Sequence, residues 1–176
     1  MDTEAALTAF RDQTRQRMAM GIRELGVWNT YVGGDCECGT CAAVPADARD
    51  DDVAAERPPF AYTTGLHGVG HPELLVFGLS PASACGVLNA VSGWVHAGRD
   101  LVPGELVELD GRSLLIEAVP NPGEIFFAAN GFYERPPEFS VLGLQVTWSD
   151  EAGRFAWEDG SLLDPADQPR PGEFRA

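Results

Sequence analysis

The chain contains no lysine. All 12 of its basic residues are arginine, against 27 aspartate and glutamate residues, so the formal net charge is -15 over 176 residues. The absence of lysine excludes catalysis through a lysine Schiff base. The excess of negative charge repels a phosphate backbone, so we expect no binding to nucleic acid. The same charge suits a basic protein partner.

Long apolar runs are also absent. No stretch of about 18 apolar residues occurs, so we expect no membrane-spanning helix and no partner in the membrane. The first residues, MDTEAALTAFRDQ, lack the basic segment, apolar core and cleavage site of a secretory signal. We therefore expect a cytoplasmic protein. No pattern in the sequence specifies its oligomeric state.

Several enzyme signatures are missing. The sequence has no G-x-S-x-G nucleophile elbow, no P-loop and no G-x-G-x-x-G turn. Serine-elbow hydrolysis and phosphate binding by these loops are therefore not predicted. Whether the protein is an enzyme stays open at this point.

Hydrophobic periodicity predicts an α+β fold. Residues 3–25 and 81–97 show apolar side chains at helical spacing, and Ser80 and Pro81 mark the start of the second helix. Residues 126–133 fit either a short helix or a strand. Six strands are predicted, at residues 27–32, 60–66, 74–79, 105–109, 113–119 and 141–148. We expect a single compact domain over residues 1–176, with a mixed or mainly antiparallel sheet packed against two helices.

Two segments lack this periodicity. Residues 35–59 contain three cysteines, then an acidic run and two prolines, and are predicted to be a long exposed loop rich in Cys and Asp. Loops longer than about 12–15 residues are usually functional or disordered. Residues 164–176 are predicted to form a polar tail.

The cysteines of the long loop are a candidate metal site. Cys36, Cys38 and Cys41 form a C-x-C-x-x-C motif, and thiolates this close together can converge on one zinc or iron ion. A fourth ligand is then needed, for which His67, His71 and Cys85 are candidates. The alternative is a set of reduced loop thiols, because no second C-x-x-C motif is present. Cys85 lies in an apolar helical pattern and is expected to be a small core residue.

A short turn between the second and third predicted strands contains the other candidate site. His67, His71 and Glu73 could bind a metal there, or place a general base beside a carboxylate. Glycines and a proline in the turn argue against helical spacing. The alternative is that His71 and Glu73 shape the turn, with the imidazole bonded to backbone groups. The two strands are expected to form a hairpin.

The strand before this turn presents hydroxyl groups. Tyr62 and Thr63 could hydrogen-bond a ligand if they face a pocket. The alternative is that they form the polar side of a half-buried strand. The candidate ligand-binding residues are therefore Tyr62, Thr63, His67, His71 and Glu73, and the candidate metal ligands are Cys36, Cys38, Cys41, His67 and His71.

Three sequence motifs carry a family resemblance. The first is YTTGL at 62–66 with GHPEL at 70–74, and the second is the helix that holds Leu88 and Asn89. The third is VLGLQVTWSDEAGRFAW at 141–157 with Gln168 and Pro169. In these motifs the chain resembles the bacterial domain-of-unknown-function family numbered 4262, with residues 26–160 as the family-like core. Ala156 stands where the family pattern has proline, and the resemblance implies no activity.

Two more distant resemblances bear on function. The hairpin followed by a helix is similar to Suppressor-of-fused-type domains, which implies an immunity or interaction role. The N-terminal helix and the following strands are similar to flavin-binding split barrels, which implies FMN. The preferred prediction is a binding module for a basic protein partner. The alternative is a zinc-, iron- or flavin-dependent enzyme that uses the cysteine loop and the histidine turn.

Overall fold

The computed structural model describes residues 3–33 and 57–176 of the chain. The predicted cysteine site, formed by Cys36, Cys38 and Cys41, lies outside these residues.

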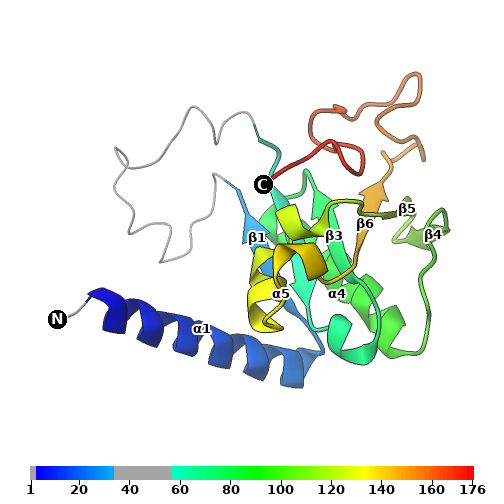
Figure 1. The fold of residues 1–176 in the computed structure, drawn as a ribbon. Helices are drawn as coiled ribbons and strands as arrows, with labels where there is room; N and C mark the ends of the chain where they lie inside the picture. The colour runs from blue at the N-terminus through cyan, green and yellow to red at the C-terminus, as the bar shows by residue number, and fades with distance from the viewer. Residues whose placement is uncertain (1–2, 34–56) are drawn as a thin grey trace.

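A six-stranded mixed sheet forms the centre of the domain (Figure 1). Its strands follow the order β1-β2-β3-β6-β5-β4, and all neighbours are antiparallel except β3 and β6, which are parallel. The strands are β1 (Trp28–Val32), β2 (Phe60–Thr64), β3 (Glu73–Phe77), β4 (Leu106–Leu109), β5 (Arg112–Ala118) and β6 (Gly143–Trp148). Strands β1 and β4 are the two edges, so this sheet is open and differs from a closed barrel. The predicted α+β class and mixed sheet are confirmed.

In residues 3–33 and 57–176, three helices and three short 3-10 turns precede or join the strands. They are α1 (Thr3–Leu25), η2 (His67–Val69), α4 (Pro81–His96), η3 (Pro122–Glu124), α5 (Phe127–Phe132) and η4 (Pro137–Phe139). The predicted start of α4 is confirmed, because the Ser80 hydroxyl accepts the Ser83 N–H at 3.3 Å and Pro81 occupies the first turn. The ambiguous segment 126–133 contains helix α5, a third helix beyond the two predicted.

The two faces of the sheet are covered by different elements (Figure 1). On one face, α4 packs against alternating strand residues through Ala84, Leu88, Val91 and Val95. On the other face, α5 and its flanking loops cover a cluster made of Phe60, Tyr62, Leu75, Phe77, Phe126, Ala129, Val141 and Phe174. Because both faces are covered, every residue of β2 and β3 is buried. This double burial explains the apolar run from Leu74 to Phe77 in β3.

The chain returns to the sheet after β6. The Phe174 ring packs at 5.0 Å from Phe60 and 4.9 Å from Phe77, measured between ring centroids. The Gln168 side chain pairs with the Trp148 backbone, with its Nε2 donating to the carbonyl at 3.1 Å and its Oε1 accepting the N–H at 3.0 Å. Residues 164–176, predicted as a polar tail, are thus anchored at two buried side chains. Among the described residues, no helix has both the length and the apolar character needed to cross a membrane.

Candidate functional site

The histidine turn is the tip of the β2–β3 hairpin. It contains the 3-10 turn η2, which ends at Gly70 with φ at +84°. Gly65, at the start of the turn, has φ at +141°, and an added Cβ there would lie 2.6 Å from the Gly26 carbonyl oxygen. A side chain at this position would therefore meet both backbone strain and a backbone clash. This strain and clash explain why the YTTGL motif has glycine at position 65.

Glu73 occupies the centre of the turn. Its carboxylate is fully buried and accepts backbone N–H groups from Gly65 at 2.9 Å, His67 at 3.0 Å and Leu66 at 3.3 Å. The Thr63 hydroxyl donates to the same carboxylate at 2.6 Å. Three successive amides and one hydroxyl thus converge on one side chain, which satisfies donors that the turn would otherwise leave unpaired.

Burial controls the protonation of this carboxylate. Loss of water raises the pKa of Glu73 above its usual value, and the hydrogen bonds from Thr63, His67, Gly65 and Leu66 oppose that effect without cancelling it. Thr63 also accepts the Leu74 N–H at 2.9 Å, so its hydroxyl links the two strands. Glu73 and Thr63 therefore act within the turn as structural groups.

His71 is a second internal connector. Its ring is buried, Leu101 donates its N–H to Nε2 at 3.3 Å, and Nδ1 lies 2.7 Å from the Pro72 carbonyl. Because Nε2 accepts a hydrogen bond, Nδ1 must carry the ring hydrogen and donate it to that carbonyl. The imidazole thereby fixes the segment after α4 against the hairpin.

His67 points to a different neighbour. Its half-buried ring meets the Tyr133 ring edge-on, with centroids 4.8 Å apart, and the Tyr133 hydroxyl accepts the Gly68 N–H at 3.2 Å. Burial lowers the pKa of His67, and the Arg135 charge lowers it further. Burial also raises the pKa of Tyr133, with a smaller contribution from the Glu73 charge. His67 and His71 are thus held by separate partners.

Tyr62 lies under α5. Its hydroxyl accepts the Ala128 N–H at 3.0 Å, and burial raises the pKa of this phenol. The structure therefore brings together Thr63, Glu73 and the His67 backbone, while Tyr62 and His71 each bond elsewhere. The described residues contain no group of three or more His, Cys, Asp or Glu side chains placed to hold a metal. Cys85, expected in the core, is a free, partly exposed thiol on α4.

A second polar cluster lies on the sheet face opposite α4. Glu117 of β5 and Gln145 of β6 are register partners. The Thr147 hydroxyl donates to Glu117 Oε2 at 2.9 Å, and Gln145 Nε2 donates to Thr147 at 3.2 Å and to the Pro169 carbonyl at 2.8 Å. Arg170 forms an ion pair with the other Glu117 oxygen. The C-terminal segment is therefore tied to the sheet through polar side chains as well as Phe174.

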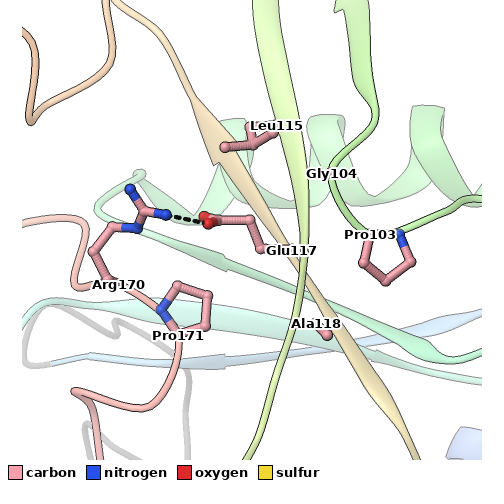
Figure 2. Close-up of a pocket in the computed structure, with 7 residues that line it drawn as sticks. All are labelled: Pro103, Gly104, Leu115, Glu117, Ala118, Arg170 and Pro171. Atoms are coloured by element: carbon pink, nitrogen blue, oxygen red, sulfur yellow. Dashed lines mark hydrogen bonds and ion pairs between the residues drawn. The ribbon is translucent and has the colours of Figure 1, made fainter.

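A pocket of about 460 Å³ opens beside this cluster (Figure 2). In Figure 2, the Arg170 guanidinium points to the carboxylate of Glu117, with which it forms an ion pair. The Arg170 guanidinium also lies over the Trp157 ring, 3.9 Å from its centroid. The pocket is lined by Pro103, Gly104, Leu115, Glu117, Ala118, Arg170 and Pro171. This corner of the molecule thus holds a guanidinium between an aromatic ring and a carboxylate.

Comparison with known proteins places the chain in a family. Residues 22–162 match the family model described as domain of unknown function DUF4262. The chain belongs to this family. No match was found among curated proteins or among solved structures. The similarity of this DUF4262 chain to Suppressor-of-fused-type domains stays a prediction, as does the cysteine metal site.

The segment after β6 has a fixed course in the DUF4262 chain although it contains neither helix nor strand. Asp150 organises its first part, because Oδ1 accepts the N–H groups of Ala152 and Arg154 at 2.9 Å and Oδ2 accepts that of Leu162 at 3.2 Å. The hydrogen bond from Arg154 is the main reason that the pKa of Asp150 lies below its usual value. One side chain thus sets the path of a long loop.

Sequence reasoning missed the Glu117 cluster, although signals for it exist. Glu117 is a charge that directly follows the apolar run LLI in β5, and a charge at such a position usually has a partner. Gln145 and Gln168 both lie in the third motif of the family resemblance. Arg170 carries no such signal, since its contact with β5 depends on tertiary structure.

Proposed function

We propose that this DUF4262 protein is a binding module and that its C-terminal segment, residues 149–176, recognises a basic protein partner. The observation that carries the proposal is the placement of Arg170, whose guanidinium lies over Trp157 and pairs with Glu117. Aromatic rings and carboxylates are the groups that bind arginine in protein interfaces. The surface therefore has chemistry complementary to a basic partner, and Arg170 of the same chain already occupies part of it.

Charge supports this choice of surface. The segment contains seven acidic and three arginine residues. Six of the acidic side chains are exposed, at Glu151, Glu158, Asp159, Asp164, Asp167 and Glu173. Two large apolar side chains are also exposed in this segment. Trp157 is 42% exposed and Leu162 is 86% exposed. Carboxylates mixed with apolar groups suit a partner segment that carries both basic and apolar residues.

The fixed course of residues 149–176 also supports their proposed role in binding a partner. Asp150, Gln168 and Phe174 hold it at three points along its length. A surface loop that is already ordered loses less conformational entropy on binding than a free chain does. Binding residues are also concentrated on loops that a rigid scaffold positions.

The histidine turn also supports the proposal that this protein is a binding module. The Glu73 carboxylate and the His71 ring nitrogens are all engaged by backbone groups or by Thr63. A general base must reach a proton on a substrate, and these groups are directed into the protein. The turn is accordingly interpreted as part of the scaffold.

A peptide titration tests the proposal. The probe is a synthetic peptide of alternating arginine and leucine, and its control is the same peptide with neutral citrulline at each arginine. We expect calorimetry to show binding of the arginine peptide alone. A triple variant of the segment, Glu151→Gln with Asp159→Asn and Asp167→Asn, should weaken it by about tenfold, since each exposed charge pair contributes modestly.

A matched variant separates a local site from net charge. Glu138→Gln with Asp100→Asn and Asp110→Asn removes the same three charges at exposed positions outside the segment. It should leave the affinity within about twofold, because distant surface charges are largely screened. Equal weakening by both triple variants, or equal binding of the citrulline peptide, would contradict the proposal.

A further inference from the structure

The backbone on both sides of Arg170 is anchored independently of the Arg170 side chain. Before it, the Pro169 carbonyl accepts a hydrogen bond from Gln145 Nε2 at 2.8 Å. After it, the ring of Pro171 restricts the backbone, and the Phe174 ring is buried against the sheet. The Arg170 side chain can therefore leave its position while the segment keeps its course.

The Arg170 guanidinium has few contacts of its own. Among the described residues it forms one ion pair, with Glu117 Oε1, and lies over the Trp157 ring. A guanidinium carries five N–H donors, so these contacts use only part of its hydrogen-bonding capacity. The side chain is 43% exposed, and ion pairs and cation–π contacts at exposed positions are individually weak. A competing guanidinium could therefore replace it.

Glu117, by contrast, needs a cation beside it. Its side chain is only 13% exposed, and its Oε2 already accepts the Thr147 hydroxyl at 2.9 Å. When the Arg170 side chain moves away, Oε1 loses its cationic partner. A largely buried carboxylate without such a partner is unfavourable, so the vacated position attracts another cation.

The pocket in Figure 2 gives an incoming side chain access to Glu117. Its volume of about 460 Å³ lies in the range of sites that bind small ligands. Leu115 and Ala118 are among its apolar lining residues, and such walls suit a side chain with a methylene stem and a charged head. A guanidinium fits better than an ammonium group, because it can pair with a carboxylate and stack on an aromatic ring at once, as Arg170 does on Trp157.

We propose that Glu117 and Trp157 form a site for one arginine side chain of the partner, and that Arg170 occupies this site until the partner displaces it. The inference rests on the proposed function, since it names where the basic partner makes its specific contact. Arg170 is then an internal competitor. An occupant that is in place about nine-tenths of the time lowers the apparent affinity of an external ligand by about tenfold.

A small cation tests the site without any partner. Methylguanidinium is titrated into the full-length variant Arg170→Ala, and nitrogen-15 NMR follows the indole N–H of Trp157. We expect saturable binding to this variant and binding to the wild type that is weaker by about tenfold, because Arg170 competes there. Neutral methylurea, which has nearly the same shape, should not bind. Adding Glu117→Gln to Arg170→Ala should abolish the binding, because the charge that holds the cation is lost.

The arginine-leucine peptide tests displacement. Calorimetry should show that Arg170→Ala binds it about tenfold more tightly than the wild type does. Arg15→Ala is the matched control, since Arg15 also pairs with a carboxylate, that of Glu134, and lies over a ring, that of Phe132. It removes the same charge outside residues 149–176 and should leave the affinity within about twofold. Circular dichroism shows whether each variant is folded.

The outcomes separate this inference from the proposed function. Absence of methylguanidinium binding to Arg170→Ala overturns the inference, whatever the peptide does. Peptide affinities that are equal for Arg170→Ala and Arg15→Ala overturn it too, and leave the proposed function intact. Loss of the fold in Arg170→Ala also overturns it, because the backbone anchors would then not hold the segment alone. If methylguanidinium binds Arg170→Ala but the peptide binds neither that variant nor the wild type, the guanidinium site stands and the proposed function fails.

Discussion

At the scale of single residues, Glu73 is an acidic side chain that lies inside the tip of the β2–β3 hairpin. Its carboxylate is fully buried and receives four hydrogen bonds, three of them from successive backbone amides. Removing it would leave these donors buried without an acceptor, which is more costly than losing a hydrogen bond at the surface. We infer that Glu73 stabilises the hairpin tip and with it the β2–β3 pair.

Substitution of Glu73 measures this contribution. Glu73→Ala should lower the free energy of unfolding by about 3–5 kcal/mol, because it creates a cavity and orphans three amides. Glu73→Gln keeps the shape and one acceptor oxygen and should cost about 2 kcal/mol. Urea denaturation at neutral pH gives both values. Equal stability of the wild type and Glu73→Ala would show that the amides find other acceptors.

The pH dependence of the stability of the wild type and of Glu73→Gln reports the protonation of Glu73. Because burial raises the pKa of Glu73, the folded protein binds this proton more tightly than the unfolded chain does. The resulting stabilisation is complete below the usual pKa of glutamate and is lost as the pH rises through the raised pKa. The stability of the wild type relative to Glu73→Gln should therefore fall across that window. If the stability of the wild type relative to Glu73→Gln increased with pH instead, the hydrogen bonds would lower the pKa of Glu73 by more than burial raises it.

The two histidines of the turn should differ in their effect on stability. His71→Ala removes a buried ring that joins Pro72 to Leu101 and should cost about 2 kcal/mol. His67→Ala removes a half-buried ring with one edge-on contact to Tyr133 and should cost less than about 1 kcal/mol. Thermal and urea unfolding of both variants checks the order. A larger loss for His67→Ala would point to a role that these contacts do not explain.

At the scale of elements, the segment after β6 is held by side chains in place of a backbone ladder. Asp150 fixes its first part and Gln168 pairs with the Trp148 backbone as an added strand would. Such a segment depends on a few groups, so loss of one should release a long stretch of chain.

Hydrogen exchange detects this release residue by residue. Asp150→Ala should raise the exchange rates of the Ala152, Arg154 and Leu162 amides by more than about tenfold, since their shared acceptor is lost. Asp150→Asn retains one acceptor oxygen and should have a smaller effect. Amides of β2 serve as the internal control and should not change. Uniform exchange across the whole chain would indicate global destabilisation instead.

The elements differ in how far the sequence predicts them. Strand β3 is predictable because burial on both faces demands apolar residues, as in Leu74 to Phe77. Helix α4 is predictable because Ser80 caps its start and Pro81 occupies its first turn. The sequence leaves the role of Glu73 open, because a carboxylate after a His-Pro pair is compatible with a metal site, a catalytic base or a turn. Gln168 and Arg170 bond to strands β6 and β5, and no local pattern reveals contacts of that range. The third helix, α5, is too short for its periodicity to be distinguished from a strand.

At the scale of the whole molecule, the net charge of -15 acts against the compact state. Like charges repel one another, and dissolved ions screen that repulsion. The melting temperature should therefore rise with sodium chloride, by an amount that corresponds to about 1 kcal/mol between low and physiological salt. Differential scanning calorimetry at fixed pH measures it. A melting temperature that falls with salt would show that attractive ion pairs dominate instead.

The central claim is that residues 149–176 form the partner-binding surface of this DUF4262 chain. The most direct test is hydrogen exchange of the full chain with and without the arginine-leucine peptide. The account predicts that added protection concentrates between residues 151 and 173, with the β2–β3 hairpin tip and α1 unchanged. Protection centred on the hairpin tip, or no protection at a saturating peptide concentration, would contradict it.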